Sequence, residues 1–457
     1  ATGTAIFKPG IQGTLVLATN RKNSSLAWGI FYQTVNIGGW MGPLVAARLR
    51  RMAWTRVFFA NAGIICINFL LLLTYKEIGK DKRLERARLR KEGKLQEGSL
   101  IADSLRELAK PHVWRYLVVF AGFWFMFMSL FEVLVLYIKH WVDTRVVVDT
   151  LFGAGGTRSE LFKSLLGMND AGTQIQPAGL LNLNAFSIML TCFLFAQLSA
   201  RMRATTSIVV GCLMATCSMF IFSSTPNGLA VAGGILLFSV GEMLSSPKFN
   251  EFMGNFAPPD KKAMYLGFSQ LPIAAGWGIE AQVGFRLYGK LASRGKFSRQ
   301  YLEERGVAAD AIKKIKRGEA FDVAVQHDHP ETRAPFAAVN RAKAAIEVLK
   351  KKGVDVAKDG AGKQALAELK QAQEALAKTD YDGKRWTLAR KLFDKHRPSR
   401  VWYAMGGVGL LSALGLAWYG KWVRKLTEQR KPATVEPTKA AEQKAEPKSK
   451  RKGDDDE

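Results

Sequence analysis

Hydrophobic residues lie in long runs that alternate with basic segments. Runs such as 54–75 and 401–423 hold about twenty mostly apolar residues, enough for a helix to cross the roughly 30 Å hydrocarbon core of a bilayer. They are too long for barrel strands, so the pattern predicts an all-α membrane protein. The candidate spans are residues 1–19, 24–47, 54–75, 113–138, 180–200, 204–223, 228–250, 262–290 and 401–424.

Two of these nine spans contain residues that are unfavourable in a membrane helix. The first contains Lys8 and Pro9, and the seventh contains Glu242, Pro247 and Lys248. An ionisable side chain deep in a bilayer is costly and tends to face a partner or a cavity. Hydropathy alone leaves these two spans open, and their charged residues become candidates for a functional site.

Two long polar segments separate the spans. Residues 76–112 are basic and contain a predicted surface helix of mixed charge at 80–91. Residues 291–400 form a predicted soluble insertion. Its stretches 337–352 and 363–378 carry apolar residues at helical spacing on either side of a glycine-bounded break, which predicts a helical hairpin.

The net charge of +27 comes from 66 Lys and Arg against 39 Asp and Glu. Lys and Arg favour the cytoplasmic side, so we place residues 76–112 and the C-terminus in the cytoplasm and the insertion outside. The four arginines of residues 48–56 then face outward, against this tendency. The tail at 427–457 is poor in large apolar residues, which predicts disorder. Apolar spans with basic loops predict a lipid-bilayer partner and no nucleic-acid partner, and we expect the protein to lie in the inner membrane of a bacterium.

Motifs of enzymes and ATP-driven pumps are missing from the sequence. The five histidines are scattered and form no metal-ligand spacing. The Gly-x4-Gly-Lys-Ser/Thr phosphate-binding motif does not occur. The four cysteines fall inside apolar runs, which indicates reduced packing residues. We therefore expect no enzyme activity, no cofactor and no metal site.

Charged residues inside the spans are the first candidates for function. Lys8, next to the helix-bending Pro9, could bind a substrate carboxylate, or it could reach the interface from a surface helix. Glu132 could take up and release a proton, or it could be a structural carboxyl bonded to a neighbouring helix. Glu242 follows a glycine and precedes a proline, a break of the kind that marks sites or gates in transporters.

Two further charges and four polar residues complete the candidates. We expect Lys248 to reach the cytoplasmic interface, and Glu280 to be either a site or a packing residue. Tyr32 and Asn36 lie four residues apart on one helix face, where both could reach a ligand. Asn182 and Asn184 open the fifth span. Hydrogen bonding between helices is the alternative role for these polar residues.

Three motifs in order resemble the major facilitator superfamily and, within it, the proton-dependent oligopeptide transporters. Residues 31–38, Phe-Tyr-Gln-Thr-Val-Asn-Ile-Gly, resemble the Phe-Tyr-x-x-Ile-Asn-x-Gly signature of the fifth helix of those transporters. Residues 7–9, Phe-Lys-Pro, are similar to their fourth helix, where a lysine precedes a proline. Residues 241–247 resemble their tenth-helix element Gly-Glu-x-x-x-Ser-Pro.

This resemblance implies that the nine spans are helices four to twelve of a transporter that is truncated at its N-terminus. It also implies that Lys8, Tyr32, Asn36, Glu132, Asn184 and Glu242 lie near the central cavity. The chain then divides into residues 1–75 (last three helices of the N-terminal bundle), 76–112 (cytoplasmic linker), 113–290 (first five helices of the C-terminal bundle), 291–400 (soluble insertion), 401–426 (last transmembrane helix) and 427–457 (tail).

The sequence therefore predicts a monomeric secondary transporter that moves a small solute, such as a di- or tripeptide, by alternating access. In this hypothesis Lys8, Tyr32, Asn36, Asn184 and Glu242 bind the substrate, while Glu132 or Glu242 takes up the coupling proton. The alternative is a membrane scaffold or receptor-like protein that does not transport and acts through residues 291–400.

Overall fold

The computed structural model describes residues 2–20, 23–74, 80–92, 99–258, 261–316, 318–351, 354, 356 and 359–429. Within these ranges the chain is helical, and two isolated β-bridges are the only extended pairings. The predicted all-α fold is therefore confirmed. The predicted disordered tail beyond Gln429 lies outside the described residues.

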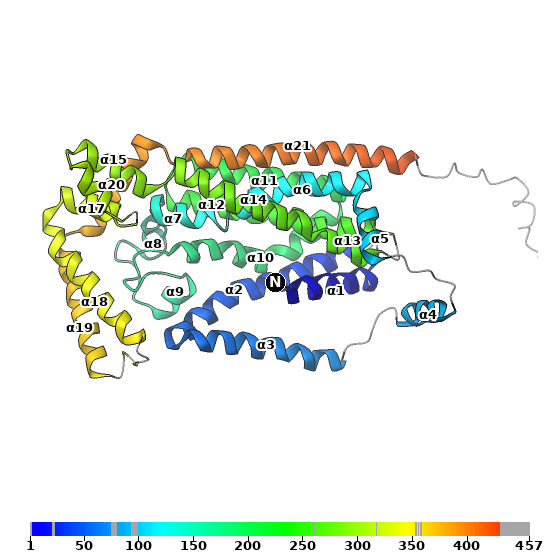
Figure 1. Cartoon of the computed structure of the whole chain (residues 1–457), viewed down its shortest axis with the longest axis horizontal. Helices are drawn as coiled ribbons and strands as arrows, with labels where there is room; N and C mark the ends of the chain where they lie inside the picture. Colours follow the sequence, from blue (N-terminus) through cyan, green and yellow to red (C-terminus); the bar gives the residue numbers. More distant parts are fainter. Residues whose placement is uncertain are drawn as a thin grey trace, which may run out of the picture.

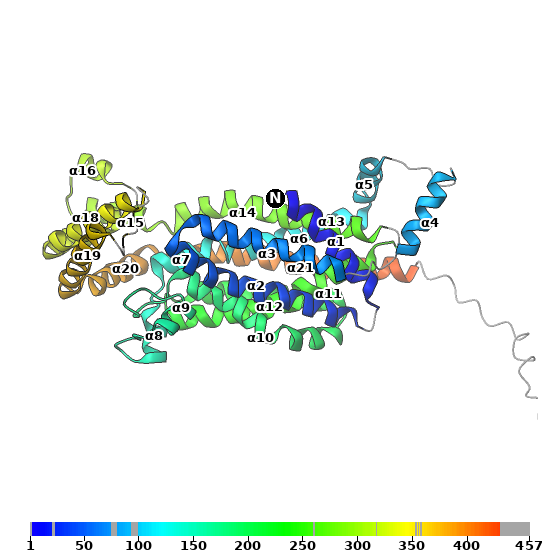
Figure 2. The same cartoon turned by 90° about the horizontal axis from the view of Figure 1, so that it is seen from below.

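Long helices run side by side along an elongated bundle, with different attachments at its two ends (Figures 1 and 2). One end carries helices α15 to α20 of the segment 291–400, and we call it the insertion end. The other carries α4 (Lys80–Lys91), α5 (Leu100–Leu108) and the last turns of α21 (Arg400–Gln429), and we call it the linker end. Helices α4 and α5 and the end of α21 thus lie at the same end of the bundle, opposite the insertion.

Within the described residues, each predicted span corresponds to one helix or to two consecutive helices. The helices are α1 (Thr2–Ala18), α2 (Ser24–Met52), α3 (Trp54–Thr74), α6 (Pro111–Ser129) continued by α7 (Val133–Trp141), α10 (Pro177–Ala200), α11 (Ala204–Ser224), α12 (Gly228–Phe256), α13 (Lys262–Phe268) followed by α14 (Gln270–Leu291), and α21.

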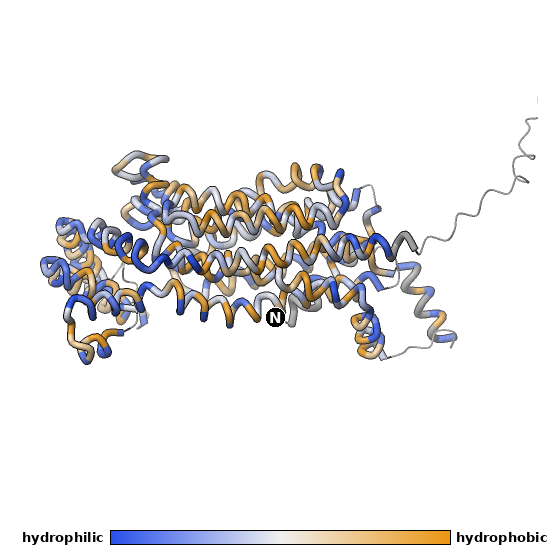
Figure 3. Tube along the Cα trace, turned by 90° about the horizontal axis from the view of Figure 1, so that it is seen from above, coloured by the Kyte–Doolittle hydropathy of each residue, from blue (hydrophilic) through white to orange (hydrophobic). Residues whose placement is uncertain are grey.

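Six of these segments are long and apolar enough by composition to cross a membrane among the described residues: α3, α6 with α7, α10, α11, α12 and α21. Hydropathy along the chain changes from apolar in the bundle to polar at both ends (Figure 3). On α3 the side chains of Phe69, Leu70 and Leu73 are exposed. An exposed apolar face of this kind fits contact with lipid.

The bundle core is rich in aromatic side chains from α6, α12 and α21. Tyr116, Phe120 and Phe249 are fully buried, and the Phe120 and Phe249 rings lie 4.4 Å apart between centroids. The Tyr116 ring also packs 5.2 Å from Tyr419 of α21. Because large rings in offset contact bury much apolar area, they hold these three helices together.

The insertion is a set of helices at one end of the bundle. It comprises α15 (Arg294–Glu304), α16 (Ala309–Lys314), α17 (Ala320–Asp328), α18 (Arg333–Lys351), α19 (Gly360–Lys378) and α20 (Tyr381–His396). The short helices α8 (Arg145–Phe152) and α9 (Glu160–Leu165) lie at the same end. Helices α18 and α19 pack through Ile346 and Ala365, so the predicted hairpin is confirmed.

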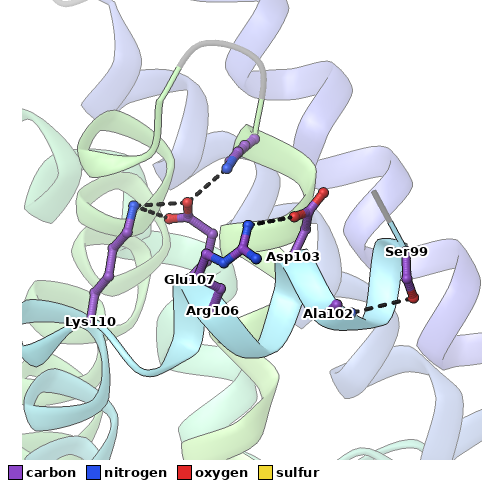
Figure 4. Close-up of polar contacts among 7 residues, drawn as sticks. Ser99, Ala102, Asp103, Arg106, Glu107 and Lys110 are labelled. Carbon is purple, nitrogen blue, oxygen red and sulfur yellow. Dashed lines mark hydrogen bonds and ion pairs between the residues drawn. The ribbon is translucent and has the colours of Figure 1, made fainter. Parts of the chain in front are cut away.

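At the linker end, α4 confirms the predicted surface helix, and Glu107 of α5 anchors the linker to the bundle. Glu107 accepts hydrogen bonds from Lys110 at 2.8 Å, Lys261 at 2.7 Å and Tyr265 at 2.8 Å. Figure 4 shows Glu107 and Lys110 of this cluster. Burial would raise the pKa of Glu107, but these donors outweigh it and lower the pKa to about 2.

We expect Glu107→Gln to destabilise the docking of α5 by about 1–2 kcal/mol, because the lysines that lose their partner are half-solvated. The pKa of Glu107 is depressed, so its contribution is full above its ordinary value of 4.5 and is lost as the pH falls towards about 2. Thermal unfolding in detergent at pH 7 and at pH 3 measures both effects.

Asp103→Asn on the same helix is the matched control, because its 3.5 Å ion pair with Arg106 is exposed and weak. Equal melting temperatures for Glu107→Gln and Asp103→Asn at pH 7 would contradict the anchoring role.

Candidate functional site

Three of the predicted site residues meet at one carboxyl group. The Tyr32 hydroxyl of α2 donates a hydrogen bond to Glu242 Oε1 on α12. Asn184 Nδ2 of α10 donates to Glu242 Oε2 at 2.9 Å and also lies 3.0 Å from Ser239 Oγ. Glu242 and Asn184 are buried, with 3% of each exposed. Both carboxyl oxygens therefore have a donor, one of them from α2.

A close helix crossing sets the position of Glu242. A Cβ on Gly241 would lie 2.5 Å from the carbonyl oxygen of Gly211 on α11, and a Cβ on Gly211 would lie 2.4 Å from that of Gly241. Only glycine at both positions allows this backbone contact. Because the face of α12 at Gly241 is taken by α11, the neighbouring Glu242 is free to reach α2 and α10.

Helix α2 is held between α10 and α12 by polar contacts along one side. Gln33 Nε2 donates to the carbonyl oxygen of Met189 on α10 at 2.6 Å, and Cys192 Sγ lies 3.5 Å from the carbonyl oxygen of Gly29. A Cβ on Gly29 would lie 2.3 Å from Cβ of Ala196. Tyr32 belongs to the same side of α2, so its hydroxyl is presented to α12 by this packing.

The substrate candidate Asn36 and the polar residue Asn182 both form hydrogen bonds with backbone carbonyls of α2. Asn36 is half-buried and its Nδ2 donates to the carbonyl oxygen of Tyr32 at 2.9 Å, within α2. Asn182 Nδ2 lies 3.5 Å from the carbonyl oxygen of Trp40, so the Asn182 side chain contacts the backbone of α2. The alternative role, hydrogen bonding between helices, describes Asn182, whereas the bond of Asn36 stays within its own helix.

Lys8 lies on α1 and is half-buried. Val16, further along α1, fits against Gly254 of α12, where a Cβ would lie 2.7 Å from Val16 Cγ2. The two helices run in the same direction (Figure 1). Lys8 lies eight residues before Val16 on α1, and Ser246 lies eight residues before Gly254 on α12. Eight residues of helix rise about 12 Å, so Lys8 lies near the level of Ser246. That is about one turn from Glu242.

Glu132 lies apart from this cluster. It occupies the turn at residues 130–132 where α6 ends and α7 begins. Trp277 Nε1 of α14 donates to Glu132 Oε1 at 3.2 Å. The structure thus brings Glu132 to α14 and Glu242 to α2 and α10, so the two predicted proton carriers have different partners.

The prediction that Lys248 reaches the interface is wrong. Lys248 of α12 is buried, and its Nζ donates to Ser25 Oγ of α2 at 2.6 Å and lies 2.9 Å from Glu251 Oε2. The Ser25 hydroxyl lies 3.0 Å from each carboxyl oxygen of Glu251. The physical reason is that an ion pair satisfies the ammonium inside the protein, so it does not need water.

Ser25 and Glu251 were missed by sequence reasoning. The available signal was the spacing of Lys248 and Glu251, which at three residues apart lie on one helix face. Together with Lys248 they form a polar contact between α2 and α12, about two turns nearer the linker end than Tyr32 and Glu242. We call Ser25, Lys248 and Glu251 the linker-end contact.

Among the described residues, no group of three or more His, Cys, Asp or Glu side chains is placed to hold a metal ion. The side chains of the site supply carboxyl, phenol, amide and ammonium groups. Such groups bind polar solutes and exchange protons.

The family model of the Major Facilitator Superfamily matches residues 1–279, which is more than half of the chain. The chain belongs to the major facilitator superfamily. The match ends within α14, before the insertion. Comparisons with curated proteins and with solved structures found no match.

Membership in this superfamily makes the chain an integral membrane protein of the secondary transporter class, with a small solute as its cargo. The helical bundle and the apolar spans agree with it.

Proposed function

We propose that this superfamily member is a proton-coupled symporter for a small zwitterionic solute of the di- or tripeptide class, with Glu242 as the central group. The observation that carries the proposal is the hydrogen bond between Tyr32 and Glu242. It joins α2, which we assign to the N-terminal bundle, to α12 of the C-terminal bundle. When a carboxyl that contacts both bundles gains or loses its charge, its interactions with both bundles change.

Glu242 changes its bonding when it binds a proton or a ligand. As a carboxylate it accepts from Tyr32 and from Asn184, which are charge-assisted bonds and stronger than neutral ones. A proton, or the ammonium group of a solute, neutralises the carboxylate and weakens its hold on the Tyr32 hydroxyl. Uptake at Glu242 thereby loosens the contact between α2 and α12.

Lys8 supplies the complementary charge for such a solute. It lies on α1 at about one helical turn from the level of Glu242, as the contact of Val16 with Gly254 indicates. An ammonium and a carboxylate separated in this way fit the two charged ends of a short peptide. This arrangement supports a zwitterionic cargo over a neutral one.

The linker-end contact supports alternating access. Ser25 on α2 bonds with Lys248 and Glu251 on α12 and holds the bundles together at that end. In the proposed cycle this contact breaks to open a path at the linker end. The charge of the linker and tail supports a cytoplasmic position for that end, and we propose that the C-terminus lies on the same side and the insertion outside.

Uptake by proteoliposomes tests this function. The purified chain, reconstituted in lipid, is given a radiolabelled dipeptide with a proton gradient directed inward. We expect accumulation that a protonophore abolishes, and none in protein-free liposomes. Uptake that is insensitive to the protonophore would contradict proton coupling, and no uptake of dipeptides or tripeptides would contradict the solute class.

A further inference from the structure

Glu280 of α14 is a buried carboxyl whose oxygens have no hydrogen-bond partner among the described residues. Its side chain is 0% exposed, and within the described residues neither Oε1 nor Oε2 has a hydrogen-bond donor. An ionised carboxylate in this position would lose its hydration without replacement, at a cost of several kcal/mol. A polar group that is buried so completely calls for a physical explanation.

Two glycines, one turn on either side of Glu280, create this position. A Cβ on Gly276 would lie 2.7 Å from the carbonyl oxygen of Ala121 on α6, so the glycine allows α14 to press against the α6 backbone. A Cβ on Gly284 would lie 2.3 Å from Glu280 Oε1, so this glycine leaves the space that the carboxyl occupies. The site is therefore shaped for a carboxyl that lies along its own helix.

A second carboxyl meets α14 within one turn of Glu280. It is Glu132, at the turn between α6 and α7. Helices α13 and α21 also pack on α14, and within the described residues neither gives Glu280 a hydrogen bond. Glu132 itself accepts a hydrogen bond from Trp277, three residues before Glu280 on α14.

From this geometry we propose that Glu280 holds a proton, and that Glu280 and Glu132 form a second proton-binding site separate from Glu242. Two carboxyls at one helix contact favour the form in which one is neutral. Glu132 accepts the indole N–H of Trp277, whereas Glu280 has no donor within the described residues and carries the proton.

The location gives this second site a role in transport. Glu132 lies where α6 gives way to α7, so a change in charge at the pair acts on the turn between two halves of one span. The proposal that Glu280 binds a proton does not depend on the proposed function. Its use in transport rests on the proton coupling proposed above.

Infrared spectroscopy of the full chain in lipid nanodiscs tests the proton at Glu280. At neutral pH we expect the wild-type spectrum to contain the carbonyl band of a protonated carboxyl in an apolar environment. Glu280→Gln should remove this band, while Glu242→Gln leaves it in place. A wild-type minus Glu280→Gln difference that shows carboxylate bands in place of the protonated band would overturn the proposal.

Two further measurements keep the test decisive. If Glu280→Gln does not fold, carbon-13 labelling of glutamate in the wild type must shift the band, and an unshifted band overturns the assignment. The reversal potential of uptake gives the ratio of protons to solute, which should fall by one in Glu280→Gln. An unchanged ratio overturns the role of Glu280 in transport. Absence of any proton-driven uptake leaves the infrared result intact and counts against the proposed function alone.

Discussion

Glu242→Gln is expected to reduce proton-driven accumulation of solute far more than exchange of solute across the membrane. The substitution keeps the shape of the side chain and removes its ability to bind a proton. Tyr32 and Asn184 lose a charge-assisted acceptor, a change worth about 1.5–3 kcal/mol for a bond to a charged group. We therefore expect gradient-driven uptake to fall by about tenfold or more, since each 1.4 kcal/mol corresponds to a factor of ten.

The measurement pairs gradient-driven uptake with counterflow in the same proteoliposomes. Ser239→Ala is the matched control, because Ser239 Oγ lies 3.0 Å from the same Asn184 amide but carries no charge. It should retain both activities. Equal accumulation by Glu242→Gln and the wild type would remove Glu242 from the coupling mechanism.

Glu251→Gln should produce the largest loss of stability. Lys248 and Glu251 are both buried, and their 2.9 Å ion pair is shared with Ser25 of α2. Removing one partner leaves a buried ammonium without its counter-charge, which costs about 3–5 kcal/mol. The loss should appear as a lower midpoint of thermal unfolding in detergent, and as weaker contact of α2 with α12.

The double substitution Lys248→Met with Glu251→Leu is the control for this prediction. Replacing both charges by apolar side chains of similar size removes the unpaired charge, and such replacements are often neutral or stabilising. The double variant should therefore regain most of the stability. If it melts as low as Glu251→Gln, the pair does not act through charge compensation.

Much of the fold follows from the sequence because a membrane helix can be recognised from the length and hydropathy of its own segment. A run such as 204–223 is long and apolar, and it becomes α11 within a residue at either end. The hairpin of α18 and α19 likewise follows from apolar spacing. The break at residues 130–132 was not predicted, because an apolar run such as 113–138 has no proline or glycine there to mark it.

The site was predictable in part. The resemblance to peptide transporters named Tyr32, Asn184 and Glu242, and the structure brings these three together. It did not reveal that Lys248 would be paired inside the bundle. A hydropathy scale assigns every lysine in a span an unfavourable transfer free energy. It contains no information about a partner such as Ser25, which is more than two hundred residues away in sequence and is brought to Lys248 by tertiary packing.

Glu280 illustrates the same limit. The sequence around Glu280 is equally compatible with a packing role and with a functional site. The decisive features are the contact of Gly276 with α6 and the lack of a donor within the described residues. Both depend on how two distant helices meet.

The central claim is that the charge on Glu242 controls the contact between α2 and α12. Spin labels at Asn23 and Asn255, both exposed near the linker end, measure this contact after Cys66, Cys192, Cys212 and Cys217 are replaced. For the wild type in nanodiscs we predict a short distance at high pH and a growing long-distance population as the pH falls. In Glu242→Gln the long-distance population should be present at every pH. A single distance that responds neither to pH nor to Glu242→Gln would contradict the account.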